Sequence, residues 1–329
     1  MPPTPKTTLP HELNRICELL RAAPSVLLTS HARPDGDSLG SQLALGEALT
    51  QLGKQVRIVN SDPAPPLYAF LPHLSSIEVT SSITPWPGQV VVLECSELGR
   101  TGVTGLESGT VLNIDHHLGN SRYGVVNWID ESACACAELV VELIEALGIT
   151  LTPEMATNAY VAILTDTGSF RHANITARTF DICRRIAATG VNPAQLAATV
   201  YNNGTMGHLR ITGRLLDRMV LEHDGRIAVL SLDESILDET GCDANDLEGV
   251  ANLPLAARDV KAVIFLRHTE NGLRVSLRSK DNIDVRQVAT SFGGGGHRNA
   301  AGLTIEDPAP DARQQLVASV AATLPDDRA

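Results

Sequence analysis

Four short apolar segments divide the first third of the chain, and each one ends in polar residues. The segments cover residues 25–30, 55–60, 89–94 and 110–115. They are continuously apolar instead of alternating, which is typical of strands buried on both faces in a parallel sheet. Residues 38–52 then carry apolar side chains at helical spacing and stop at Gly53, a common helix end. This pattern predicts an α/β fold with a doubly wound, mainly parallel sheet.

Helical patterns dominate the next part of the chain. Residues 132–147 form one such pattern, which Gly148 closes, and Thr152-Pro153 offers an N-cap followed by a proline at the first helical position. The remaining helices are predicted over residues 176–189 and 193–200, followed by an arm over residues 206–221.

The sequence changes character after this arm. Strands are predicted over residues 227–232 and 260–268, and Asn271-Gly272 is a strong hairpin signal that leads into residues 273–279. That last strand alternates leucine and valine with Arg274, Ser276 and Arg278, so that one face is apolar and the other cationic. A short helix, a glycine run and a closing helix over residues 309–324 complete a smaller α/β domain with a mixed sheet.

The length of the chain agrees with two domains. A domain typically takes about 150 residues, and the chain has 329. We expect a first domain over residues 1–200, a helical linker over residues 201–222 and a second domain over residues 223–329.

The charge limits the partners that the chain can have. It carries 26 Lys and Arg against 38 Asp and Glu, a formal net charge of −12. Proteins that follow long nucleic acids release counterions through a basic surface, so binding of long duplexes is not expected. No stretch is long and apolar enough to span a membrane, and the opening residues do not resemble a signal peptide. We therefore expect a cytoplasmic protein without a membrane partner.

Acidic and histidine residues gather where the predicted strands and helices end. In an open α/β sheet, such residues converge beyond the carboxyl ends of the strands. Four or more carboxylates cannot stay ionised close together without cations, because like charges raise one another's pKa. Mixed imidazole and carboxylate ligands suit Mn, Fe or Zn, and a metal pair is typical of phosphoryl hydrolysis. The residues concerned are His31, Asp35, Asp37, Glu94, Asp115, His116, His117 and Asp166.

The order and spacing of these residues resemble those of the DHH phosphoesterases, and GGGGHRNAAG at residues 293–302 resembles their associated C-terminal domain. The resemblance runs from about residue 25 to residue 302 and is greatest to the bifunctional oligoribonucleases that are also phosphoadenosine phosphate (pAp) phosphatases. It implies two divalent ions, with Mn favoured, in a cleft between the domains.

The resemblance also implies a role for each residue of the cluster. His31, Asp35 and Glu94 would hold one metal ion. Asp37, His116 and Asp166 would hold the other and share Glu94. His117 would contact the scissile phosphate, and Asp115 would orient the histidines. The family usually has Asp where this chain has Glu94, so the bridging role is the least secure.

The activity implied is that of a 3′–5′ exonuclease that releases 5′-mononucleotides from very short single-stranded RNA and removes the 3′-phosphate of pAp. Two alternatives stay open. The first is hydrolysis of the linear di-adenylate derived from cyclic di-AMP. The second is a nucleotide sensor without catalysis, which the change to Glu94 makes conceivable. We also leave a homodimer open.

The glycine run Gly293, Gly294, Gly295 and Gly296 is a candidate phosphate site. Its backbone amides could approach an anion, and a turn into a following helix would add the helix dipole. The run fits neither the dinucleotide-binding pattern nor the P-loop pattern. The resemblance implies that it binds the substrate's terminal phosphate and nucleotide. The residues expected to share this task are Ser279, Arg278, His297 and Arg171.

One competing motif involves Ser38. Residues 36–40 read GDSLG, which satisfies the G-x-S-x-G pattern of serine esterases. That pattern requires the serine on a tight turn directly after a strand, whereas Pro34 and a polar loop intervene here. We therefore expect Ser38 in the first turn of a helix and treat an esterase as the weaker hypothesis.

Overall fold

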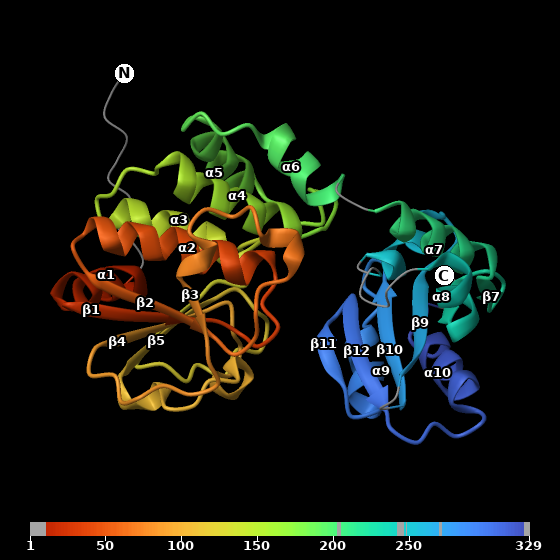
Figure 1. The fold of residues 1–329 in the computed structure, drawn as a ribbon. Helices are drawn as coiled ribbons and strands as arrows, with labels where there is room; N and C mark the ends of the chain where they lie inside the picture. Colours follow the sequence, from red (N-terminus) through yellow and green to blue (C-terminus); the bar gives the residue numbers. More distant parts are fainter. Residues whose placement is uncertain (1–10, 203–204, 242–246, 248, 270–271, 326–329) are drawn as a thin grey trace. The chain divides into compact units, whose positions relative to one another are not determined.

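The computed structural model describes residues 11–202, 205–241, 247, 249–269 and 272–325. The chain divides into two compact units, Met1–Asn203 and Gly204–Ala329 (Figure 1). Each unit has its own sheet and its own apolar core. No helix in the described ranges is long and apolar enough to cross a membrane.

The first unit contains a six-stranded sheet in the order β3-β2-β1-β4-β5-β6, and every pairing in it is parallel. This confirms the predicted parallel sheet. Two strands were not predicted, β3 and β6, because they are short and mostly half-buried or exposed, and so leave no apolar run. The strands are β1 (Ser25–Thr29), β2 (Gln55–Asn60), β3 (Ile77–Val79), β4 (Gln89–Leu93), β5 (Thr110–Asp115) and β6 (Val126–Ile129).

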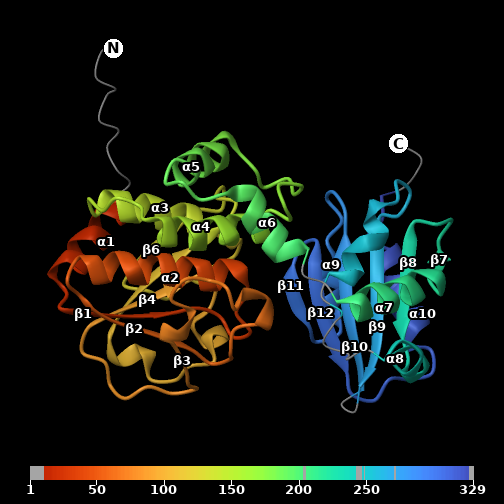
Figure 2. The ribbon, with the colours of Figure 1, turned by 45° about the horizontal axis from the view of Figure 1, so that its top comes forward.

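Six helices accompany this sheet, and Figure 2 shows α2, α3 and α4 together above it. Helices α1 to α4 bury their apolar side chains against one face of the sheet. Loops and 3-10 turns around Val103 and Leu106 cover the other face. The helices are α1 (His11–Ala22), α2 (Gly36–Gln51), α3 (Cys136–Ala146), α4 (Pro153–Asp166), α5 (Ala177–Ala187) and α6 (Pro193–Tyr201).

The starts of the helices follow from local chemistry. Thr152 accepts a hydrogen bond from the Met155 amide and Pro153 opens α4, as predicted. Helix α3 begins at Cys136 instead of residue 132, because Ser132 donates its amide and its hydroxyl to Asp130 in a turn. The first amides of α3, those of Cys136 and Ala137, donate to Asp37.

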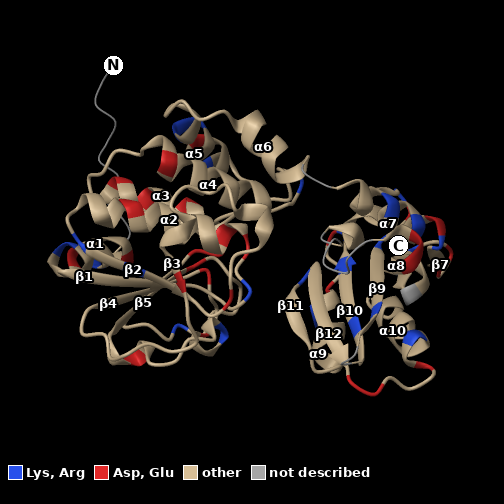
Figure 3. Cartoon of the chain, viewed as in Figure 1, with Lys and Arg blue, Asp and Glu red and all other residues tan. Residues whose placement is uncertain are grey.

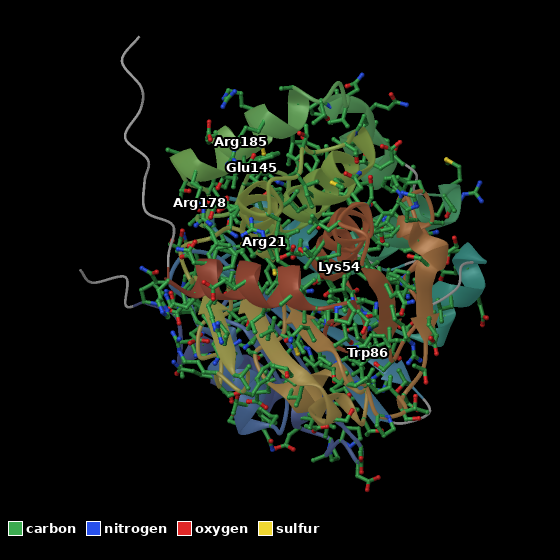
Figure 4. The ribbon with its side chains drawn as sticks, turned by 90° about the vertical axis from the view of Figure 1, so that its left-hand side faces the viewer. Arg21, Lys54, Trp86, Glu145, Arg178 and Arg185 are labelled. Carbon is green, nitrogen blue, oxygen red and sulfur yellow. The ribbon has the colours of Figure 1, made fainter. Side chains whose placement is uncertain are left out.

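Ion pairs join α3 to α5 on the surface of the first unit. Arg185 of α5 pairs with Glu145 near the end of α3, and Figure 4 shows these residues beside Arg178. Arg178 itself donates to Glu142 and to Asp130. These contacts fix α3 against its neighbours along most of its length.

The second unit contains a mixed sheet in the order β11-β12-β10-β9-β8-β7, in which β8 and β9 are parallel and the other pairs antiparallel. Strands β9 and β10 pair as the predicted hairpin requires; Asn271 lies outside the described residues. The strands are β7 (Val220–Glu222), β8 (Ile227–Leu232), β9 (Ala262–Thr269), β10 (Gly272–Ser279), β11 (Gly295–His297) and β12 (Ala300–Ile305).

Within the described part of this unit, four helices pack around the second sheet. Helix α7 lies in the segment that we assigned to a linker, and its Ile211 and Leu215 are buried in the core of the second unit. The helices are α7 (Met206–Asp217), α8 (Glu234–Thr240), α9 (Val285–Ser291) and α10 (Ala312–Ala321).

Helices α2 and α4 approach closely at Gly40. A Cβ atom added at Gly40 would lie 2.3 Å from the carbonyl oxygen of Asn158 and 2.9 Å from the Cβ atom of Ala162. Only a glycine lets the two backbones come this near. Since Asp37 and Asp166 lie on these helices, the contact also sets the distance between two of the predicted ligands.

Replacing Gly40 by Ala should therefore destabilise the first unit by about 1–3 kcal/mol, the usual cost of overpacking a core. Both tryptophans of the chain, Trp86 and Trp128, lie in this unit, so fluorescence during urea unfolding reports on it. Gly99→Ala is the matched control, because a Cβ atom there meets nothing within 4 Å. Equal urea midpoints for the two variants would contradict the role of the close contact.

Candidate metal centre

The predicted cluster forms where the sheet reverses its strand order. Strands β1 and β4 are neighbours although two strands separate them in the sequence, and ligands in such sheets bind beyond this switch point. His31 and Asp35 follow β1, and Glu94 directly follows β4. Asp115 ends β5, and Asp166 ends α4.

The structure brings all six predicted metal ligands together. The Nε2 atom of His31 lies 2.6 Å from Glu94 Oε2 and 3.7 Å from Asp35 Oδ2. On the other side, His116 Nε2 lies 3.7 Å from Asp37 Oδ2 and 3.6 Å from Asp166 Oδ2. Each triad, and a third made of Glu94, His116 and His117, has donor atoms that all lie within 4.8 Å of one another. These residues could hold metal ions.

The environment of the His116 Nε2 atom indicates what kind of ligand the site could hold. It is buried and has no hydrogen-bond partner among the described residues. Three carboxylates face it at 3.6–3.9 Å, which is too far for hydrogen bonds. Its other ring nitrogen lies 3.2 Å from the Ala133 carbonyl, the kind of partner that orients a ligand histidine. The donor set therefore fits a divalent cation.

Asp37 is held by the start of α3. Its carboxylate is buried and accepts hydrogen bonds from the amides of Cys136, at 2.6 Å, and Ala137, at 3.0 Å. The Ser41 hydroxyl donates a third bond at 2.9 Å. These donors and the positive end of the helix dipole stabilise the carboxylate and fix its direction. The position of Ser41 one helical turn after Asp37 could have indicated this contact from the sequence. Nothing in the sequence indicates the contacts made by the amides of Cys136 and Ala137.

Asp115 orients His117. The Asp115 Oδ1 atom lies 2.7 Å from Nδ1 of His117 and also accepts the amides of His116 and His117. Asn120 donates to the second carboxylate oxygen at 2.6 Å. The ring of His117 is thereby directed with Nε2 toward Glu94, 3.2 Å away. Asn120 was not singled out in the sequence, because a loop asparagine five residues away carries no pattern.

The pKa values of the buried acids shift in opposite directions, depending on how many histidines lie beside each of them. Burial, together with Glu94 and the other acids, raises the pKa of Asp37 to about 6 and that of Asp166 to about 8, although His116 opposes the shift. Burial also acts on Glu94, but His31 and His117 outweigh it and hold its pKa well below its usual value. Without cations, Asp37 and Asp166 therefore keep their protons to a higher pH than an isolated aspartate does.

Glu94 adopts a strained backbone, with φ at +52°. Such a conformation in a residue other than glycine often marks a functional site. Its carboxylate accepts a hydrogen bond from the Ser38 hydroxyl at 2.9 Å. Ser38 is buried in the first turn of α2, and residues 30–35 separate this helix from β1. The tight strand-to-helix turn of an esterase nucleophile is therefore missing, and the hydroxyl serves Glu94.

Comparison with known proteins agrees with this geometry. Residues 25–163 match the N-terminal domain of the DHH family, and residues 224–325 match the DHHA1 domain. The bifunctional oligoribonuclease and PAP phosphatase NrnA of Thermus thermophilus is 33% identical over 296 residues, which cover 90% of this chain and 89% of that protein. This chain belongs to the DHH family. It is a phosphoesterase by that membership.

A further relative is similar in sequence, and two solved structures are similar in fold. The protein named NrnA in Bacillus subtilis is 25% identical over 285 residues, covering 85% of this chain and 89% of that protein. An exopolyphosphatase-related protein of Bacteroides fragilis has the same fold, with a TM-score of 0.88 at 23% identity over 97% of this chain and 98% of that chain. RecJ of Thermus thermophilus in complex with Mn²⁺ is more distant, with a TM-score of 0.55 at 16% identity, covering 98% of this chain and 56% of that one.

The DHHA1 unit places Arg278 and His297 on one face of its sheet. Arg278 pairs with Ala300, and Ala300 pairs with His297, so the three form one row across β10, β12 and β11. Side chains directly opposite each other in an antiparallel sheet share a face. Ser279, the next residue of β10, lies on the other face, where it is buried and donates its hydroxyl to the Ile283 carbonyl.

The glycine run of the DHHA1 unit differs from its expected form. No helix follows it, because residues 295–297 form β11 and pair with β12. The amides of Gly293 and Gly294 donate to the carbonyls of Thr290 and Ala289 and so close α9. The prediction that the backbone amides of the run are available to an anion is therefore wrong for Gly293 and Gly294. Arg171, in the first unit, is exposed and donates to the Gly168 carbonyl.

Asp166→Asn tests the electrostatics of the metal centre. A carboxyl whose pKa is raised from 3.8 to about 8 destabilises the folded protein at every pH above its unfolded value, and most above about pH 8. The metal-free variant should therefore melt at a higher temperature than the wild type at about pH 9, and at the same temperature near about pH 4. Mn²⁺ should stabilise the wild type only.

Thermal melts in EDTA or Mn²⁺ measure both effects. Glu107→Gln is the control, since it removes an exposed carboxylate of the same unit. A variant that Mn²⁺ still stabilises as much as the wild type would remove Asp166 from the ligand set.

Proposed function

We propose that this DHH phosphoesterase is a two-metal 3′–5′ exonuclease that releases 5′-mononucleotides from very short single-stranded RNA and removes the 3′-phosphate of pAp. The observation that carries the proposal is a pair of neighbouring ligand triads. One contains Glu94, and the other contains His116, whose Nε2 atom lies 3.9 Å from Glu94 Oε1. The names of the relatives, oligoribonuclease and PAP phosphatase, support the choice of substrates.

The residues present fit two divalent ions, and we propose Mn²⁺. His31, Asp35 and Glu94 would hold one ion. Asp37, His116 and Asp166 would hold the other, with Glu94 between them. When bound, such a pair lowers the pKa of the attacking water and neutralises the charge of the phosphoryl group.

The chain's own residues would prepare the substrate for attack. Burial lowers the pKa of His117, but Glu94 and Asp115 outweigh it and raise the pKa above its usual value. A protonated His117 with its ring fixed by Asp115 can donate from Nε2 to an oxygen of the scissile phosphate.

The DHHA1 unit would bind the terminal phosphate and nucleotide through Arg278 and His297. Arg278 forms no ion pair among the described residues, and burial lowers the pKa of its guanidinium. An anionic ligand would give the guanidinium an ion-pair partner and would offset the effect of burial on its pKa. Gly295 and Gly296 extend the same site. Ser279 would support it from the opposite face by fixing the turn at Ile283, and Arg171 stays a candidate contact in the first unit.

The complete ligand set favours an enzyme over a nucleotide sensor. A sensor that had lost catalysis would be expected to lack at least one ligand, and here every predicted carboxylate and imidazole reaches the cluster. No feature of the described residues favours the linear di-adenylate over other short substrates. The homodimer finds no support in the described residues, and the cytoplasmic location and the site between the units stay predictions.

A chromatographic time course tests the proposal. The substrates are 5′-phosphorylated RNAs of two to ten nucleotides, the linear di-adenylate and pAp, each with and without Mn²⁺. We expect Mn²⁺-dependent release of 5′-mononucleotides from the shortest RNAs and of phosphate from pAp. Absence of product from every substrate would favour the sensor.

His116→Ala should reduce hydrolysis more than about 100-fold, because the loss of an outer partner of a ligand alone costs about 10–100-fold. His11→Ala, at the exposed start of α1, is the control and should keep full activity. Activity that survives EDTA but disappears in Ser38→Ala would instead support the esterase.

A further inference from the structure

A second cationic row crosses the same face of the DHHA1 unit. Arg274 of β10 lies directly opposite Arg267 of β9 on one side and Thr304 of β12 on the other. In antiparallel pairs these three side chains share a face, and the alternation along β10 makes it the face of Arg278. Figure 3 shows the basic residues on β9 and β10 in blue.

This row is unfavourable for the sheet by itself. Like charges directly opposite each other destabilise a strand pair. Burial and the neighbouring Arg274 lower the pKa of Arg267. No carboxylate of a described residue forms an ion pair with Arg267 or Arg274, although the chain has an excess of acids. The Nε atom of Arg267 is buried and has no hydrogen-bond partner within the described ranges. The arrangement is what a site for an anion requires.

The row between the two arginine rows is exposed on β11 and β12 and buried on β9, where Phe265 lies. The intermediate row consists of Gly295, Gly302, Ser276 and Phe265. The first three have small side chains or none, and the guanidinium of Arg267 lies over the Phe265 ring, 5.5 Å from its centre. Four residues along β10 separate Arg278 from Arg274, or about 14 Å. The small residues Ser276, Gly302 and Gly295 leave room for a phosphate chain on the β10, β12 and β11 side of this row.

We infer that Arg267, Arg274 and Thr304 form a second phosphate subsite, which binds a backbone phosphodiester of the RNA one or more nucleotides away from the end held by Arg278. The inference rests on the proposed function and deepens it. The two phosphates of pAp flank a single ribose, so this ligand is too short to reach both rows. The subsite therefore acts on oligonucleotides and not on pAp.

The experiment compares the Arg267→Gln/Arg274→Gln variant with wild type on a 5′-phosphorylated pentanucleotide and on pAp. KM for the pentanucleotide should rise at least 10-fold, and KM for pAp should stay within twofold. Arg258→Gln, an exposed arginine of the same unit, controls for the loss of charge.

Binding of a fluorescent pentanucleotide in EDTA gives a readout that does not depend on turnover. The dissociation constant of the double variant should rise at least 10-fold, and the slope of its logarithm against the logarithm of salt should fall by about 0.7 for each phosphate that the variant no longer neutralises. Removing two opposed like charges should leave the melting temperature unchanged or higher, which a merely structural role would not do.

The outcomes separate the two proposals. Equal losses for pAp and the pentanucleotide, or no loss for either, would overturn the subsite and leave the proposed function standing. If the wild type hydrolyses no substrate, the proposed function fails, and the pentanucleotide binding measured in EDTA still decides the subsite. A double variant with a lowered melting temperature and uniform losses would show that the arginines serve the fold.

Discussion

The metal centre depends on counter-charge for buried carboxylates. Asp37, Glu94 and Asp166 approach the same histidine within 3.9 Å, and burial makes their mutual repulsion stronger. The fold supplies part of the compensation through imidazoles, through the first amides of α3 and through serine hydroxyls. The raised pKa values of Asp37 and Asp166 show that this compensation is incomplete. The divalent ions that we propose would complete it, and the close contact of α2 with α4 at Gly40 keeps Asp37 near Asp166.

The DHHA1 unit shows the opposite imbalance, because it has arginine side chains without carboxylate partners among the described residues. Arg267, Arg274 and Arg278 share one face of a sheet and have no carboxylate partner among the described residues, in a chain whose net charge is −12. This is how the proposed action on short RNA is compatible with a strongly acidic protein, because the positive charge that a phosphate chain needs is concentrated on a few side chains. Long duplexes would meet the acidic remainder of the surface and be repelled.

Much of the architecture could be predicted, because strands, helices and candidate ligands follow from the periodicity of apolar residues and the spacing of polar ones. The continuous apolar runs predicted β1, β2, β4 and β5, and the polar residues after them predicted a cluster that the structure brings together. What could not be predicted depends on backbone groups or on tertiary contact. The amides that hold Asp37 belong to residues about 100 positions away, and those of Gly293 and Gly294 are used by the preceding helix. The pattern of side chains in a sequence does not predict which acceptor a backbone amide will meet.

Glu94 lies where the two groups of candidate ligands meet. Its amide donates to the Ile114 carbonyl, which extends the pairing of β4 and β5 and fixes the backbone at the edge of the sheet. With the backbone fixed, the additional methylene moves the carboxylate further into the cluster than aspartate could reach. The φ value of +52° and the bond from Ser38 then set the direction in which the longer side chain extends. The carboxylate then lies 2.6–3.9 Å from the Nε2 atoms of His31, His116 and His117, so the length of this side chain sets how it joins the two ligand groups.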